Sequence, residues 1–157
     1  MDNLKIVPFT VDYKSAFEHL NREWIEEFFE MEEEDLKTLQ NPESYVIKQG
    51  GEIFFAVLDG DVVGTAAMIK TSQGIYELAK MAVAKNFQGL GIGKKLIKRC
   101  IDFSKEREAT EIFLITNDSL KPALSLYLSF GFVLNDQNDD NRYERGNTKM
   151  NLLIGGK

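Results

Sequence analysis

Three glycines at alternate positions stand where an apolar run ends and a helical pattern begins. The apolar run covers residues 75–83, and apolar side chains with helical spacing extend over residues 92–103. Glycine has no Cβ to keep a ligand away from the backbone, and it tolerates positive φ. A glycine-rich loop that enters a helix also presents unpaired N–H groups at the positive end of the helix dipole. The loop therefore predicts a site for a phosphate or diphosphate, held by the backbone of Gln88, Gly89, Leu90, Gly91, Ile92, Gly93 and Lys94.

Several kinds of glycine loop bind phosphates, and the spacing here separates them. The nucleoside-triphosphate loop, G-x-x-x-x-G-K-S/T, does not fit, because Gln88 takes the place of its first glycine and Lys95 that of its Ser or Thr. The dinucleotide loop, G-x-G-x-x-G, does not fit, because Lys94 takes the place of its last glycine. The pattern that fits is Q-x-x-G-x-G, formed by Gln88, Gly91 and Gly93. It resembles the acetyl-CoA diphosphate loop of the GNAT superfamily of N-acetyltransferases, whose pattern is R/Q-x-x-G-x-G/A.

A second segment, C-terminal to the loop, is also similar to that superfamily. Residues 117–132 match its pattern N-x-x-x-x-x-A-x-x-L-Y-x-x-x-G-F. Asn117, Ala123 and Tyr127 are the N, A and Y of this pattern. The resemblance implies that Tyr127 faces the sulfur of CoA and that Asn117 contacts the pantetheine arm. Ala123 belongs to the same cofactor-binding segment.

The strand before the loop is expected to hold the pantetheine arm. The arm carries amides that need an extended partner, as in strand addition. The resemblance implies that this partner is the backbone of Met81, Ala82 and Val83. A main-chain N–H in this segment is also a candidate donor to the thioester carbonyl.

Acetyl transfer to an amine requires the neutral amine, and this requirement defines the candidate catalytic residues. A lysine-like amine has a pKa near 10.4, so the neutral form costs roughly 4–5 kcal/mol at pH 7. Glu77 is the candidate base, acting through water; the alternative is a salt-bridged or solvated carboxylate, with Lys80 as the suggested partner of a salt bridge. Tyr127 is the candidate proton donor to the departing thiolate, although a tyrosine is a weaker acid than a thiol by ~1.5 pKa units. The alternative for Tyr127 is a core aromatic residue.

Composition restricts the other classes of function. With 157 residues, 43% of them apolar and 28% charged, one domain spanning residues 1–157 is expected. The net charge of −6 disfavours a nucleic-acid partner. No apolar run suits a membrane span or a signal peptide, so we expect no membrane partner and a cytoplasmic location.

The sequence has too few cysteine and histidine residues for a zinc site or for a catalytic pair of nucleophile and base. The one cysteine, Cys100, and the one histidine, His19, cannot form a zinc site of the usual kinds or a catalytic pair. Cys100 is on the apolar face of its helix and is expected to be a buried thiol. We therefore expect no metal, no covalent enzyme intermediate, and direct attack of a primary amine on acetyl-CoA in a ternary complex.

The remaining pattern predicts a mixed α/β (α+β) fold. We expect a strand at residues 4–9, a helix from Tyr13 with Phe17, Leu20, Trp24 and Phe28 on its buried face, and an acidic run at 30–35. That run is expected to form a solvated face, with the mouth of an amine pocket as the alternative. Two hairpins follow, turning at Asp59-Gly60 and Gln73-Gly74.

A βαβ crossover then joins the strand at 75–83 to an apolar strand at 112–115. A short helix capped by residues 117–119 follows, then a strand from Phe132, a loop at 135–141 and a last strand at 143–153. This order matches the GNAT fold, a mostly antiparallel sheet with one crossover and flanking helices.

Two other functions use the same loop. A catalytically silent module that senses acyl-CoA would bind acetyl-CoA without releasing CoA thiol. A nucleotide-binding domain would be protected by ATP or NAD better than by acetyl-CoA. For the acetyltransferase, the acceptor can be a small-molecule or peptide amine, and the resemblance is compatible with a homodimer.

Overall fold

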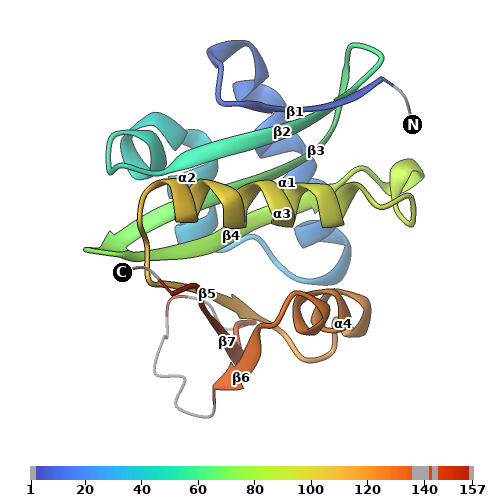
Figure 1. Ribbon diagram of the computed structural model, residues 1–157. Helices are drawn as coiled ribbons and strands as arrows, with labels where there is room; N and C mark the ends of the chain where they lie inside the picture. Colours follow the sequence, from blue (N-terminus) through green and yellow to red (C-terminus); the bar gives the residue numbers. More distant parts are fainter. Residues whose placement is uncertain (1–2, 136–141, 143–144, 156–157) are drawn as a thin grey trace.

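The architecture is a seven-stranded sheet covered by helices on both faces (Figure 1). The computed structural model describes residues 3–135, 142 and 145–155. The strands lie in the order β1-β2-β3-β4-β5-β7-β6, and only β4 and β5 are parallel among the pairs described. Their bounds are β1 Leu4–Pro8, β2 Glu52–Leu58, β3 Asp61–Ser72, β4 Ile75–Val83, β5 Glu111–Thr116, β6 Val133–Asn135 and β7 Thr148–Leu153.

The helices separate into two layers because the central strands are apolar on both sides. Phe54 and Phe55 are adjacent in β2 and both buried, yet they belong to different core clusters, as alternating strand side chains must. The Phe54 side is covered by α3 (Ile92–Glu106) and α4 (Lys121–Ser129). The Phe55 side is covered by α1 (Lys14–Phe28), α2 (Glu33–Gln40) and the π-helix Glu43–Ile47. Among the described residues, no helix is both long and apolar enough to cross a membrane.

The sheet divides where β4 leaves β5. These strands pair only from Ile75 to Glu77 on β4 and from Glu111 to Phe113 on β5. Beyond this point β4 continues beside β3 to Val83, while β5 continues beside β7 to Thr116. In Figure 1 the β5, β7 and β6 group accordingly lies apart from the β1–β4 group. Within the described part of the chain, one edge of β4 therefore has no strand partner beyond Glu77.

Most of the expected elements are confirmed, including the hairpin at Asp59-Gly60 and the crossover helix between parallel strands. The buried face of α1 differs, because Ile25 is buried whereas Phe28 is 59% exposed. The N-cap of α4 is Leu120 rather than one of residues 117–119. The last strand begins at Thr148, and the expected loop at 136–141 and the strand start at 143–144 lie outside the described residues.

Candidate active site

A cavity of about 560 Å³ occupies the space between the diverging halves of β4 and β5. Of the residues expected to act on acetyl-CoA or the amine, those that line it are Glu77, Met81, Ala82, Val83, Gln88, Asn117, Ala123 and Tyr127. They come from β4, the loop after it, the end of β5 and α4. The divergence of two parallel strands thus brings residues separated by up to 50 positions to one cavity.

The glycine loop adjoins this cavity at Gln88. The Gln88 side-chain amide donates to the carbonyl of Val83 at 3.1 Å, which closes the loop onto the end of β4. Gly89 and Gly91 have φ of +81° and +84°, and a Cβ added to either would meet nothing within 4 Å. The loop backbone is therefore open to a ligand where α3 begins.

The remaining loop residues lie outside the cavity lining, in the first turn of α3 or just before it. Leu90, Lys94 and Lys95 are exposed. Gly93 is helical, and its added Cβ would lie at an ordinary 3.5 Å from Leu126. The Ile92 side chain is buried in the core, so only its backbone amide can serve a ligand.

A β-bulge interrupts β4 beside the cavity. Ala79 pairs with Ala67 and Ala82 with Thr65, so β4 has one residue more than β3 across this interval. Lys80 takes up the irregularity with φ of +53°, a conformation that costs a non-glycine residue about 1–3 kcal/mol. The carbonyl of Lys80 accepts a hydrogen bond from the buried Asn21 side chain of α1 at 3.1 Å.

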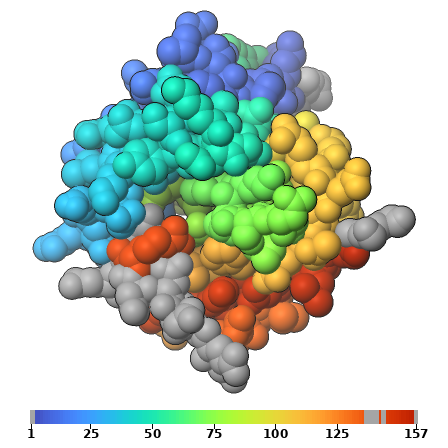
Figure 2. Space-filling view, turned by 90° about the vertical axis from the view of Figure 1, so that its left-hand side faces the viewer, coloured from blue at the N-terminus to red at the C-terminus, as the bar shows by residue number. Residues whose placement is uncertain are grey.

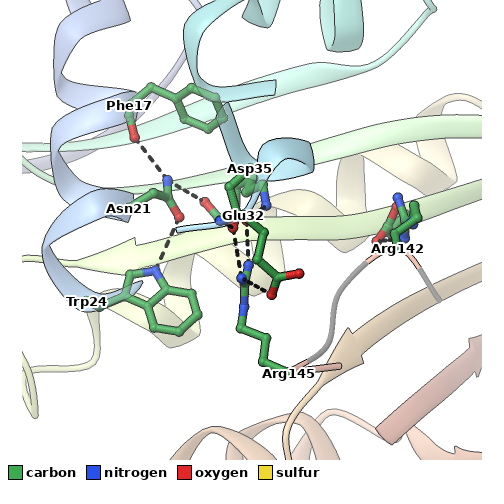
Figure 3. Close-up of polar contacts among 9 residues, drawn as sticks. Phe17, Asn21, Trp24, Glu32, Asp35, Arg142 and Arg145 are labelled. Atoms are coloured by element: carbon green, nitrogen blue, oxygen red, sulfur yellow. Dashed lines mark hydrogen bonds and ion pairs between the residues drawn. The ribbon is translucent and has the colours of Figure 1, made fainter. Parts of the chain in front are cut away.

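A buried ion cluster holds the Lys80 side chain. Figure 3 shows two of its members, Asp35 and Glu32, beside the Arg145 guanidinium. Its Nζ lies 2.6 Å from Oδ1 of Asp35, and the Arg145 guanidinium binds both oxygens of Asp35, one of them at 2.8 Å. Arg145 also pairs with Glu32 at 3.2 Å. In the space-filling view the orange-red segment near Arg145 lies beside the blue segment that contains Glu32 and Asp35 (Figure 2).

The charge state of Asp35 follows from these contacts. Burial alone would raise the pKa of this carboxyl, but the hydrogen bonds of Arg145 and the charge of Lys80 outweigh burial and lower the pKa to about 2. Burial lowers the pKa of Lys80, and the adjacent Asp35 carboxylate opposes that shift. The expectation of a solvated acidic run at 30–35 is therefore wrong for Asp35, whose side chain is fully buried.

Glu77 lines the cavity and has a different environment at each carboxylate oxygen. Its Oε2 is 2.7 Å from the Arg142 guanidinium, while its Oε1 is buried and has no hydrogen-bond partner among the residues that the structure describes. The alternative of a salt-bridged Glu77 is confirmed, but the partner is Arg142 and not the suggested Lys80, which pairs with Asp35. A buried carboxylate oxygen without a partner keeps its capacity to accept a hydrogen bond from an N–H or O–H group.

Tyr127 is both a core residue and a cavity residue. Its ring packs edge-on against Phe132 at 6.0 Å, and only 9% of the residue is exposed. Burial raises the pKa of Tyr127 to about 12, with a smaller contribution from Cys100. The hydroxyl therefore stays protonated at neutral pH and is able to donate a hydrogen bond.

The side chain of Asn117 already has protein partners at both ends. Its Nδ2 donates to the carbonyl of Arg145 at 2.8 Å, and its Oδ1 accepts from the N–H of Ser119 at 2.8 Å. Asn117 thereby attaches the segment around Arg145 to the end of β5. Its contact with a pantetheine arm stays a prediction.

Sequence reasoning missed the aromatic part of the cavity wall. Trp24, Phe28 and Phe29 line the cavity from the C-terminal end of α1, and Trp24 packs edge-on against Phe29 at 6.3 Å. Trp24 and Phe28 were assigned to the buried face of α1 by their spacing. The spacing signals an apolar face but does not show whether that face meets the core or a cavity.

The cysteine and histidine take no part in this site. Cys100 is fully buried, as expected, and burial raises the pKa of its thiol well above the ordinary value. His19 is exposed on α1 and its nearest carboxylate is Glu23 at 4.0 Å. Among residues 3–135, 142 and 145–155, no group of His, Cys, Asp or Glu side chains is arranged to hold a metal ion.

Comparison with known proteins gives a family match and curated relatives. Residues 13–132 match the model of the acetyltransferase (GNAT) family. The N-acetylaspartate synthetase of Xenopus tropicalis is 38% identical over 92 residues, which are 57% of this chain and 34% of that protein. The chain thus matches about a third of the length of that curated relative.

Solved structures share the fold over nearly the whole chain. An acetyltransferase of the GNAT family from Staphylococcus aureus has a TM-score of 0.87 at 24% identity, covering 96% of this chain and 98% of its own. The yncA protein of Salmonella typhimurium, solved with its cofactor acetyl-CoA, has a TM-score of 0.79 at 18% identity and covers 96% of this chain and 94% of its own. The expected fold class is confirmed.

The lowered pKa of Asp35 predicts a specific acid sensitivity. Its folded-state pKa of about 2 lies below the ordinary 3.8, so this stabilisation is complete above pH 4 and is lost as pH falls toward 2. The shift corresponds to about 2 kcal/mol. We expect Asp35→Asn to lower the unfolding free energy at pH 7 and to flatten its decline between pH 4 and pH 2, measured by urea unfolding. Asp102→Asn, at an exposed pair with Lys98, is the control, and an unchanged acid decline in Asp35→Asn would contradict the assignment.

Proposed function

Because the chain belongs to the acetyltransferase (GNAT) family, we propose that it transfers an acetyl group from acetyl-CoA to a primary amine by direct attack in a ternary complex. The observation that carries the proposal is the cavity between β4 and β5, which adjoins the open glycine loop at Gln88. A ligand with a diphosphate at one end and an extended, amide-bearing arm would span both features.

The residues present fit such a ligand. The loop of residues 88–94 offers its backbone amides to a diphosphate. Gly89 and Gly91 have no Cβ, and the space that a Cβ would fill there is open. The unpaired edge of β4 at Met81, Ala82 and Val83 offers backbone groups to the arm. When bound, acetyl-CoA supplies an activated acetyl group; the residues of the chain align it with the amine and exclude water.

Glu77 is proposed to remove a proton from the amine. Glu77 is among the residues that line the cavity, and the Arg142 contact at Oε2 orients its carboxylate, whose Oε1 is buried and has no hydrogen-bond partner among the described residues. Neutralising a lysine-like amine costs roughly 4–5 kcal/mol at pH 7, so an acceptor for that proton is needed near the reacting carbon. The proton passes to the Glu77 carboxylate through water.

Tyr127 and the bulge are proposed to stabilise the transition state. A backbone N–H near Met81 donates to the carbonyl oxygen as negative charge develops there. The Tyr127 hydroxyl donates a hydrogen bond to the departing sulfur. Full proton transfer from Tyr127 is uphill, because its pKa of about 12 exceeds that of a thiol.

The acceptor is proposed to be a small-molecule or peptide amine. The matched relative is named for acetylation of aspartate, which makes amino acids the first group to test. Peptide N-termini and polyamines complete the panel. The test is release of CoA thiol from acetyl-CoA by wild-type protein with each amine, and absence of turnover with all of them would contradict the proposed activity.

Glu77→Gln should reduce kcat by roughly a hundredfold or more at pH 7, because the base is replaced by a group of the same shape. The deficit should shrink as pH rises toward the pKa of the amine, since more acceptor is then already neutral. Steady-state kinetics from pH 6 to 10 measure it. Glu111→Gln serves as the control, because Glu111 is a partly buried carboxylate on β5 outside this cavity. Equal pH profiles for Glu77→Gln and wild type would reject the base assignment.

Tyr127→Phe should lower kcat by roughly ten- to a few-hundred-fold with little change in the KM for acetyl-CoA. The hydroxyl is lost while the ring keeps its contact with Phe132. Tyr76→Phe is matched to it, since Tyr76 is a buried tyrosine of the same core whose hydroxyl contacts Gly50 away from the cavity. If turnover in Tyr127→Phe stays at the wild-type level, Tyr127 is only a core residue.

A further inference from the structure

We infer that Asn21 and the ion cluster of Asp35 and Arg145 are positioning devices that hold the bulge at Lys80 and thereby aim the backbone of residues 81–83 into the cavity. The kinetic part of this inference rests on the proposed function. The structural part does not, because it concerns which contacts keep a strained backbone in place.

The bulge needs an anchor because its backbone is strained. Among the described residues, the non-glycine positions with positive φ are Asp59, Lys80 and Glu108. Asp59 lies in a hairpin turn and Glu108 follows the end of α3, where such conformations are common. Lys80 alone among these lies inside a strand, between Ala79 and Ala82, which both pair with β3. A strand residue in this conformation persists only where its surroundings over-determine it.

Asn21 anchors the main chain of the bulge. Its Nδ2 donates to the carbonyls of Lys80 and Phe17, at 3.1 and 3.0 Å, and its Oδ1 accepts from Nε1 of Trp24 at 3.3 Å (Figure 3). With carbonyl oxygens on one side and an N–H on the other, the amide can face only one way. The residue is fully buried, so water cannot replace these partners. Asn21 therefore fixes the direction of the peptide group that follows Lys80.

Asp35 anchors the side chain of the same residue. The 2.6 Å contact with Lys80 comes from α2, so the bulge is held from two helices, by its backbone and by its ammonium group. Both partners of this ion pair are buried, and a buried charge that loses its partner is strongly unfavourable.

Arg145 extends the cluster to the opposite side of the cavity. Its guanidinium binds Asp35 and Glu32, while its main-chain carbonyl accepts from Asn117 at the end of β5. One chain of contacts thus joins the bulge of β4 to the end of β5 across the cavity. This chain sets the separation of the two diverging strands.

A cluster that only stabilises the fold and a cluster that positions the bulge differ in their expected effects on hydrogen exchange and on kcat. Loss of a stabilising contact lowers global stability and raises hydrogen exchange wherever global unfolding governs it. Loss of a positioning contact loosens residues 80–83 in particular. It also lowers kcat, because a small misplacement of the reacting groups is costly.

The decisive experiment compares Asn21→Leu with Ser104→Ala. Ser104 is also fully buried and also donates to the carbonyl four residues earlier, that of Cys100, but it lies on α3 away from the cavity. Amide hydrogen exchange is measured by NMR, with rates corrected for the global stability of each variant. We expect exchange at residues 80–83 to rise by about tenfold or more in Asn21→Leu and to stay unchanged in Ser104→Ala. With an active amine, kcat should fall about 10- to 100-fold in Asn21→Leu while the KM for acetyl-CoA stays within a factor of about three.

Lys80→Met provides a second, independent variant. It removes the ammonium anchor but leaves Asp35 paired with Arg145, so no buried carboxylate loses all its partners. It should show the same local increase in exchange, and it decides the matter if Asn21→Leu does not fold. Wild-type exchange rates at residues 80–83 in the folded variants would overturn the inference. If wild-type protein acetylates no amine, the proposed function fails, and exchange at residues 80–83 still decides the positioning role.

Discussion

The end of pairing between β4 and β5 is the constraint on which the rest of the structure depends. Two parallel strands that stay hydrogen-bonded leave no room between them, whereas here pairing stops at Glu77 and Phe113. Beyond that point, backbone groups on one edge of β4 have no strand partner among the described residues, and such groups require a hydrogen-bond partner when they are enclosed. The same divergence creates the cavity and exposes the glycine loop beside it. A ligand with an extended arm that carries amides would supply hydrogen-bond partners to these backbone groups of β4.

The divergence involves a strained backbone at Lys80, and contacts from neighbouring helices stabilise this conformation. The positive φ of Lys80 turns β4 away from regular pairing, and contacts from α1 and α2 hold it there. The three carboxylates Glu32, Asp35 and Glu77 are matched by Lys80, Arg142 and Arg145. Most of the charge around the cavity is therefore balanced within the protein. The charge of Glu77 is matched by Arg142 as well, but its Oε1 is buried without a hydrogen-bond partner among the described residues.

The sequence predicted those parts of the site that depend on local pattern. The glycine spacing, the apolar strand before it and the segment around Tyr127 are contiguous motifs, so each could be identified from neighbouring residues. The cluster around Asp35 could not, because its cations lie 45 and 110 positions away in the sequence. An acidic run is usually solvated, and nothing within residues 30–35 distinguishes the one carboxylate that turns inward. For the same reason Arg142, 65 positions from Glu77, could not be recognised as its partner.

Isothermal titration of the folded protein with acetyl-CoA and with CoA tests the central claim most directly. The account predicts saturable one-to-one binding of both, with ATP and NAD competing poorly. Binding should be greatly weakened in Gly91→Val, because a branched side chain at a φ of +84° distorts the loop that holds the diphosphate. If wild-type protein of confirmed fold binds neither acetyl-CoA nor CoA, the diphosphate site and the acetyl transfer built on it are both wrong.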